Sequence, residues 1–124
     1  MQGAVEPMLK FGNKPVYLAC EYTDMRKQID GLAAKVQADF ALNPFDGALF
    51  VFCNRARNRI KVLEWDGDGF WLYFKRLERG RFRWPEPGSG EPIQLTTEEL
   101  EVLVSSAKLT QKLRRQEVRA GKFF

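Results

Sequence analysis

Histidine is absent from the 124 residues, which removes the Ser-His-Asp and Cys-His nucleophilic systems and most zinc sites. The chain also lacks a glycine-rich phosphate loop and the converging carboxylates of a two-metal nuclease. Asp66 and Asp68 resemble the opening of a calcium loop, but Phe70 stands at its fifth position, so a hairpin turn is favoured. We therefore predict no catalytic residues, no metal and no other cofactor.

Long apolar runs and cysteines are equally scarce. No stretch reaches the roughly 18 apolar residues of a membrane span, and the first residues lack the apolar core of a secretory signal. The two cysteines, Cys20 and Cys53, lie in apolar, strand-like contexts. Buried reduced thiols are therefore favoured over a disulfide. These features predict a cytoplasmic protein without membrane contact.

The formal net charge of +4 conceals an uneven distribution along the chain. Residues 54–85 hold nine Lys and Arg against four Asp and Glu, and residues 107–124 hold six against one. The rest of the chain is acidic. Such asymmetry predicts a polyanionic partner, the alternative being a solvated surface with a basic tail.

Short apolar segments bounded by turn residues predict a sheet. The first, residues 15–20, begins at a proline, which cannot donate to a neighbouring strand. The second, residues 48–53, is apolar on both faces, as is typical of a central strand covered on both sides. Three further segments are expected as strands: residues 59–65, 70–76 and 81–84.

Two helices are expected beside these strands. Apolar residues at three- and four-residue spacing predict one from Thr23 or Asp24 to about Phe40. Thr96 and Glu99 form the pattern of a capping box before a second. The predicted class is α+β, an antiparallel β-meander of four to five strands flanked by two helices. The expected divisions are an N-terminal extension, a single α+β domain, and a basic C-terminal tail or helix extension: residues 1–14, 15–107 and 108–124.

The register of the meander decides which side chains it shows to solvent, because a one-residue slip exchanges the two faces of a strand. We predict a three-residue loop at 67–69 that closes on a left-handed glycine and pairs Asp66 with Phe70, and a similar loop at 78–80. One face then forms a core: Ile60, Val62, Leu72, Phe74, Phe82 and Trp84. The opposite face is basic and aromatic: Lys61, Trp65, Trp71, Tyr73, Lys75, Arg81 and Arg83.

The basic and aromatic face is the candidate nucleic-acid site. In this register Lys61 lies opposite Lys75, and Lys75 opposite Arg83, which costs stability unless an anion neutralises the row. Interleaved aromatic rings would stack on bases. The alternative is that the first helix covers the aromatic residues and leaves the basic row at the rim of the sheet. The predicted nucleic-acid-binding residues are Lys61, Trp71, Tyr73, Lys75, Arg81 and Arg83 of the meander, with Lys112, Arg114 and Arg115 of the tail.

Four motifs occur in order along residues 15–105: TDMRK with IDGLA, FxGALFVF, WDGDGFxLYxKRLxxGRFxWP and LTxxxL. Their combination resembles the small TnpB-type accessory protein of bacterial insertion sequences of the IS sixty-six family. The resemblance implies an accessory role in transposition, beside a separate transposase encoded by the same element. It carries over no catalytic residues.

Together, the residues and the resemblance predict a non-enzymatic accessory protein of transposition. Its expected partners are DNA at the ends of the insertion sequence and the element's transposase, which it would bridge. The alternative is a protein-only adaptor that docks the transposase through its aromatic residues without touching DNA. Salt dependence of binding separates the two, because only phosphate contacts weaken steeply with salt.

Overall fold

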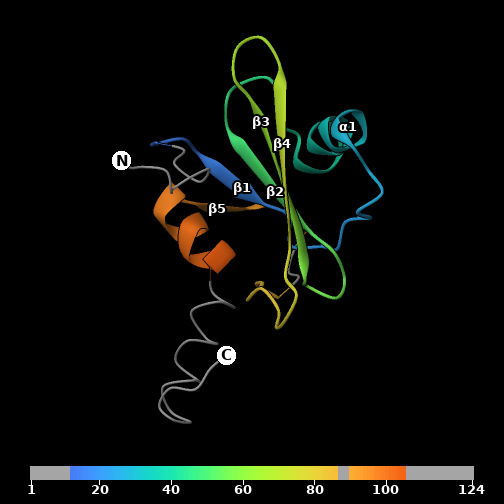
Figure 1. Ribbon diagram of the computed structural model, residues 1–124. Helices are drawn as coiled ribbons and strands as arrows, with labels where there is room; N and C mark the ends of the chain where they lie inside the picture. The colour runs from blue at the N-terminus through green and yellow to red at the C-terminus, as the bar shows by residue number, and fades with distance from the viewer. Residues whose placement is uncertain (1–11, 87–89, 106–124) are drawn as a thin grey trace, which may run out of the picture.

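The computed structural model describes residues 12–86 and 90–105 and contains a five-stranded sheet with one helix on each face (Figure 1). The second helix, residues 97–105, carries no label in Figure 1 and is called the C-terminal helix here. The predicted α+β class is confirmed. In chain order the other elements are β1 (Val16–Leu18), α1 (Ile29–Phe40), β2 (Leu49–Cys53), β3 (Arg59–Trp65), β4 (Phe70–Arg76) and β5 (Ile93–Leu95).

The sheet order is β4-β3-β2-β1-β5, so β4 and β5 form its two edges. β2, β3 and β4 make the expected antiparallel meander, whereas β1 lies parallel to β2. A parallel neighbour needs a long crossover connection, and α1 supplies it. β5 pairs antiparallel with β1 and was not among the predicted strands, because three residues are too few to show a periodic pattern.

The core consists of two layers separated by the sheet. β2 is buried along its whole length, as predicted for a central strand. Leu49 and Val51 face the C-terminal helix, where they pack with Leu100. Phe50 and Phe52 face α1. The sheet is thus covered on both faces, but α1 does not cover Trp71 and Tyr73 as the alternative expected, because they lie on the opposite face.

Both cysteines are buried and unpaired, which confirms the expected reduced thiols. Burial raises the pKa of the Cys53 thiol to about 12 and also raises that of Cys20. Because the thiolate is the reactive form, a raised pKa makes both thiols less reactive than an ordinary exposed cysteine.

The pairing of β3 with β4 corrects the predicted register by one residue. Trp65, not Asp66, pairs with Phe70, and the loop between them has four residues. Its left-handed glycine is Gly67, with φ 109°. Asp66 organises this loop: its backbone N–H donates to the Gly69 carbonyl at 3.0 Å, and its carboxylate accepts from the Trp71 indole at 2.6 Å. Those bonds stabilise the longer loop.

The slip moves two predicted core residues to the other face. Ile60 and Val62 pack with Phe82 and Trp84 as predicted, but Leu72 and Phe74 lie on the α1 face. Phe74 is 54% exposed, so its assignment to the core was wrong.

Substitution of Phe74 with alanine should therefore change stability little. We expect the free energy of unfolding to fall by less than about 1 kcal/mol, since an exposed side chain leaves no cavity. Phe52→Ala, at a fully buried ring, should cost about 3–5 kcal/mol and serves as the matched control. Urea denaturation followed by circular dichroism measures both. A loss of several kcal/mol for Phe74→Ala would restore the predicted register.

Residues 81–84 do not form the predicted strand. The chain turns at Gly80 (φ 78°), as expected, and then passes across the end of the sheet instead of pairing with β4. The Phe82 N–H donates to the Arg57 carbonyl at 2.7 Å, and the Trp84 indole donates to the Ala19 carbonyl at 2.9 Å. Burial of two large aromatic rings in the core outweighs the ladder bonds of a short edge strand.

Helix α1 begins at Ile29, later than predicted, and ends at Phe40 as predicted. In a helix starting at Thr23 the carbonyls of Met25 and Lys27 would accept intrahelical bonds. They accept instead from the Lys61 ammonium of β3, at 2.9 and 2.8 Å. This tertiary contact with Lys61 accounts for the later start of α1.

The capping box of the C-terminal helix is confirmed. The Thr96 N–H donates to the Glu99 carboxylate at 2.8 Å, and the Glu99 N–H donates to the Thr96 hydroxyl at 3.0 Å. Leu100 and Val104 then follow at four-residue spacing and enter the core.

Candidate nucleic-acid interface

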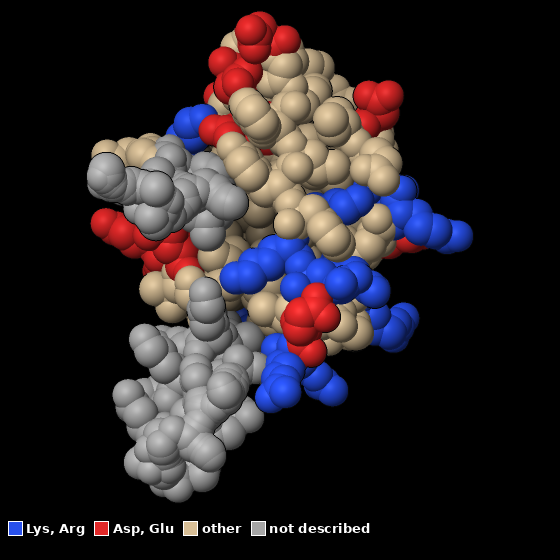
Figure 2. Space-filling model, viewed as in Figure 1, with Lys and Arg blue, Asp and Glu red and all other residues tan. Residues whose placement is uncertain are grey.

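Charge on the surface is divided between the two ends of the sheet. In the view of Figure 2, Lys and Arg gather over the lower half, where the β2–β3 connection and the chain after β4 lie in Figure 1. Asp and Glu gather at the top, around the loop between β3 and β4. The basic end is therefore where an anionic partner is attracted most strongly.

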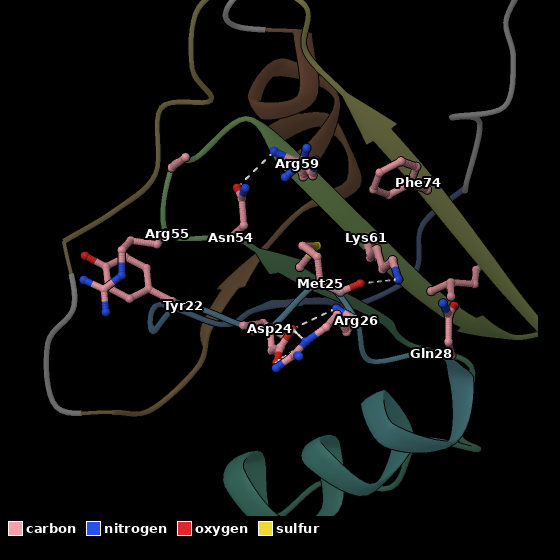
Figure 3. A pocket seen from close by; sticks show the side chains of 13 residues that line it. Tyr22, Asp24, Met25, Arg26, Gln28, Asn54, Arg55, Arg59, Lys61 and Phe74 are labelled. Carbon is pink, nitrogen blue, oxygen red and sulfur yellow. Dashed lines mark hydrogen bonds and ion pairs between the residues drawn. The ribbon is translucent and has the colours of Figure 1, made fainter.

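A groove of about 1100 Å³ opens at this basic end, on the α1 face of the sheet. We call it the basic groove (Figure 3). Three parts of the chain build it: the connection from β1 to α1, the β2–β3 connection, and the exposed side of β3 and β4. The lining residues are Tyr22, Thr23, Asp24, Met25, Arg26, Gln28, Asn54, Arg55, Ala56, Arg59, Lys61, Leu72 and Phe74.

Asn54 shapes the wall formed by the β2–β3 connection. Its side-chain oxygen accepts from the backbone N–H groups of Asn58 and Arg59, both at 3.0 Å. Its backbone N–H donates to the Arg59 carbonyl at 3.2 Å. An asparagine that bonds back to its own turn helps to hold the loop in shape. Arg55, within this turn, is consequently exposed at the groove.

Lys61 holds the opposite wall in place. It is only 5% exposed, and its two bonds to the carbonyls of Met25 and Lys27 fix the connection that precedes α1. In the same connection Asp24 accepts three hydrogen bonds from the Arg26 guanidinium, at 2.8 to 3.1 Å. Those bonds hold the pKa of Asp24 well below its usual range. The one lining carboxylate is thus neutralised by its own neighbour.

Phe74 lies among cations on the floor of the groove. It pairs across the strands with Lys61, whose Nζ lies 5.8 Å from the centre of the ring. At the next pair on the same face of the sheet, Arg59 of β3 lies directly opposite Arg76 of β4. Both arginines are exposed, and like charges in this position destabilise a sheet. Arg76 pairs with Glu78 at 2.9 Å, which offsets part of that repulsion.

Tyr22 and Arg55 form a second aromatic and basic unit. The Arg55 guanidinium carbon lies 4.4 Å from the centre of the Tyr22 ring, within the range of a cation–π contact. Figure 3 shows this pair at one end of the basic groove, with Phe74 and Gln28 at the other. The groove therefore has an aromatic ring at each end, with the exposed Arg55 guanidinium at one and the buried Lys61 ammonium near the other.

Among the predicted site residues that the structure describes, Lys61 alone lines the groove, and it does so as a structural residue. Lys61 was expected to be exposed and is buried. On the other face of the sheet, the Lys75 ammonium donates to the Val104 carbonyl at 3.0 Å and so contacts the C-terminal helix. Since Lys61 pairs with Phe74, and Lys75 with Ile60, the predicted row of like charges is absent.

Trp71 and Tyr73 are stacked on each other on the face opposite the groove, with ring centres 6.2 Å apart. Trp71 is 55% exposed. The Tyr73 hydroxyl donates to the buried carboxylate of Glu64 at 2.7 Å, and Glu64 also pairs with Lys14. Partial burial and this carboxylate raise the pKa of Tyr73. The two predicted aromatic site residues are thus separated from the basic groove.

Arg81 and Arg83 are exposed on the segment that crosses the end of the sheet. Their side chains alternate with the buried Phe82 and Trp84, as the predicted pattern required. The structure brings them to the basic end but not into the groove lining. Three further predicted residues lie outside the described part of the chain: Lys112, Arg114 and Arg115.

Sequence reasoning missed most of the groove. Tyr22 and Arg26 come from the connection before α1, whereas Arg55 and Arg59 come from the β2–β3 connection and the start of β3, about thirty residues later in sequence. Only folding brings them together. The one available signal was the run of alternating arginines at 55, 57 and 59 in a polar connection. Phe74 was missed because the register assigned it to the core.

Over residues 12–86 and 90–105, no three His, Cys, Asp or Glu side chains gather as potential metal ligands. In the same part of the chain, no helix has the length and apolar character needed to cross a bilayer.

Comparison with known proteins places the chain in a family. The family model described as "IS66 Orf2 like protein" matches residues 14–114. Uncharacterized protein y4hO of Sinorhizobium fredii (strain NBRC 101917 / NGR234) is 44% identical over 93 residues, covering 75% of this chain and 80% of its own. Uncharacterized protein y4jC of the same strain is 31% identical over 100 residues, covering 81% and 85%. No solved structure matches.

The family match defines the class of this protein, an accessory protein of an insertion sequence. The chain belongs to the IS66 Orf2-like family, the family that its motifs resemble.

Proposed function

We propose that this accessory protein binds DNA during movement of its insertion sequence and that the basic groove is the contact surface. The observation that carries the proposal is the exposed ring of Phe74 with Lys61 opposite it and the Arg59–Arg76 pair beside it. A polyanion would relieve the repulsion of that pair and occupy the adjoining groove. In transposition, DNA at the ends of the element is the polyanion we expect, with the protein bridging it to the transposase.

Removal of two groove cations should weaken DNA binding. For Arg55→Ala, Arg59→Ala we expect at least about a tenfold loss of affinity at low salt, because charge-assisted contacts to phosphate are lost. The slope of log affinity against log salt should flatten by about 1.4 to 1.8 units. Fluorescence anisotropy of a labelled oligonucleotide, titrated at several salt concentrations, measures both quantities. Stability should stay unchanged, since both side chains are exposed.

Arg81→Ala, Arg83→Ala is the matched control, because it removes the same charge from the same end of the molecule but outside the groove lining. If the groove is the contact surface, this variant should lose clearly less affinity. Equal losses would mean that general charge, and not the groove, controls binding. Lys112, Arg114 and Arg115 are predicted to add to the DNA affinity whether or not the groove is the contact surface. Truncation after residue 107 tests this contribution.

The second candidate function is a protein-only adaptor that docks the transposase. The exposed, stacked Trp71 beside Asp66 favours it, because exposed tryptophans are enriched at the centres of protein interfaces. An apolar interface of this kind would show little salt dependence. If the full-length protein does not bind DNA at low salt, the protein-only adaptor becomes the favoured function.

A further inference from the structure

The exposed ring of Phe74 is accessible because α1 does not extend over it. Helix α1 packs on residues of β2, β3 and β4 that include Phe50, Phe52, Leu63 and Leu72. Phe74 lies beyond this cluster on the edge strand β4, with Lys61 as its cross-strand neighbour. Aromatic side chains are normally buried, so a half-exposed ring among cations has available stacking surface.

The shape of the basic groove restricts what can use that ring. Its volume of about 1100 Å³ is that of a site for a small ligand or a few units of a polymer. In a duplex the bases are stacked inside and paired, so their faces cannot reach a side chain on the floor of a groove. An unpaired strand can turn a base outward and place its phosphates along the walls.

Other lining groups suit such a strand. The Arg55 guanidinium, already stacked on Tyr22, offers a cation that can contact a phosphate. Arg59, exposed between the two ends of the groove, can contact the phosphate next to the base on Phe74. Thr23 lines the same groove, and its buried hydroxyl has no hydrogen-bond partner in the described part of the chain.

We infer that the basic groove binds unpaired DNA, with one base stacked on Phe74 and the neighbouring phosphates on Arg59 and Arg55. This inference rests on the proposed function and specifies its ligand. Unpaired strands occur wherever the ends of an element are cut or opened, so the inference places the protein at opened ends rather than on intact duplex.

The test compares a labelled single-stranded oligo-thymidine with a duplex of equal length, using the full-length protein and fluorescence anisotropy. The protein should bind the single strand more tightly at the same salt concentration. Phe74→Leu, which keeps apolar volume but removes the ring, should weaken single-strand binding by about five- to 100-fold. Duplex binding should change less than about twofold.

Trp71→Leu is the matched control, because Trp71 is equally exposed on the same strand but faces the opposite side. It should leave both affinities unchanged. If Phe74→Leu leaves single-strand affinity intact, or Trp71→Leu lowers it instead, the inference is overturned while salt-dependent DNA binding still supports the proposed function. If the unaltered protein binds neither DNA at low salt, both are overturned together.

Discussion

Replacement of Trp84 with alanine is expected to lower the free energy of unfolding by about 3–5 kcal/mol. Trp84 is 8% exposed and packs in the core between the sheet and the C-terminal helix. Its indole donates to the Ala19 carbonyl at 2.9 Å, at the start of the connection that forms one wall of the basic groove. Its own carbonyl accepts from the Arg57 guanidinium at 3.4 Å. The substitution therefore opens a cavity and releases the segment that crosses the end of the sheet.

Trp84→Phe separates packing from hydrogen bonding. It retains most of the ring but leaves the Ala19 carbonyl without its donor, which should cost roughly 1–3 kcal/mol. Urea denaturation followed by circular dichroism gives both values. A loss below about 1 kcal/mol for Trp84→Ala would show that residues 81–84 are not part of the core.

Substitution of Lys61 with methionine should have the next largest effect on stability. Methionine keeps the aliphatic length of the side chain but removes the ammonium that binds the carbonyls of Met25 and Lys27. Loss of charge-assisted hydrogen bonds at a site only 5% exposed should lower the free energy of unfolding by about 1.5–3 kcal/mol. The methionine variant no longer buries a charge, so part of the desolvation cost of the ammonium is recovered. The expected fall in the free energy of unfolding is therefore smaller than the contribution of two full hydrogen bonds.

Lys75→Met is the control for this prediction. Lys75 also bonds a backbone carbonyl, that of Val104, but on the other face and away from the groove. Both variants lose one positive charge, yet only Lys61→Met should loosen the groove wall and weaken DNA binding beyond the effect of charge. Amide hydrogen exchange in residues 24–28 provides a local measurement. Unchanged protection there in Lys61→Met would contradict the bracing role of Lys61.

Trp84 and Lys61 both support the walls of the basic groove. The walls of the basic groove are irregular connections, and a loop without regular structure depends on side chains for its shape. Asn54 holds one connection from within, whereas Lys61 and Trp84 hold the other from the sheet and from the crossing segment. Residues that never touch DNA would therefore control the affinity of those that do.

Local features of this protein could be predicted from its sequence alone. The capping box at Thr96 depends on residues three positions apart, and the apolar run over residues 48–53 shows burial on both faces without reference to any other segment. The presence of a hairpin between residues 59–65 and 70–76, though not its register, and the family motifs are local in the same sense. Because each signal lies within a few residues, no knowledge of packing was needed to read it.

The tertiary structure decided the rest, because the competing energies were non-local. The register of β3 with β4 differs by one residue from the predicted one, and that single step moves Phe74 from the predicted core to the surface. The Lys61 ammonium binds the carbonyls of Met25 and Lys27, which a longer helix would have used for its own hydrogen bonds. Phe82 and Trp84 are buried in the core and do not form the predicted edge strand. The sequence by itself determined the fold class and the basic, aromatic character of the surface. Only packing determined that a different set of side chains, among them Tyr22, Arg55 and Phe74, meets in a groove on the α1 face.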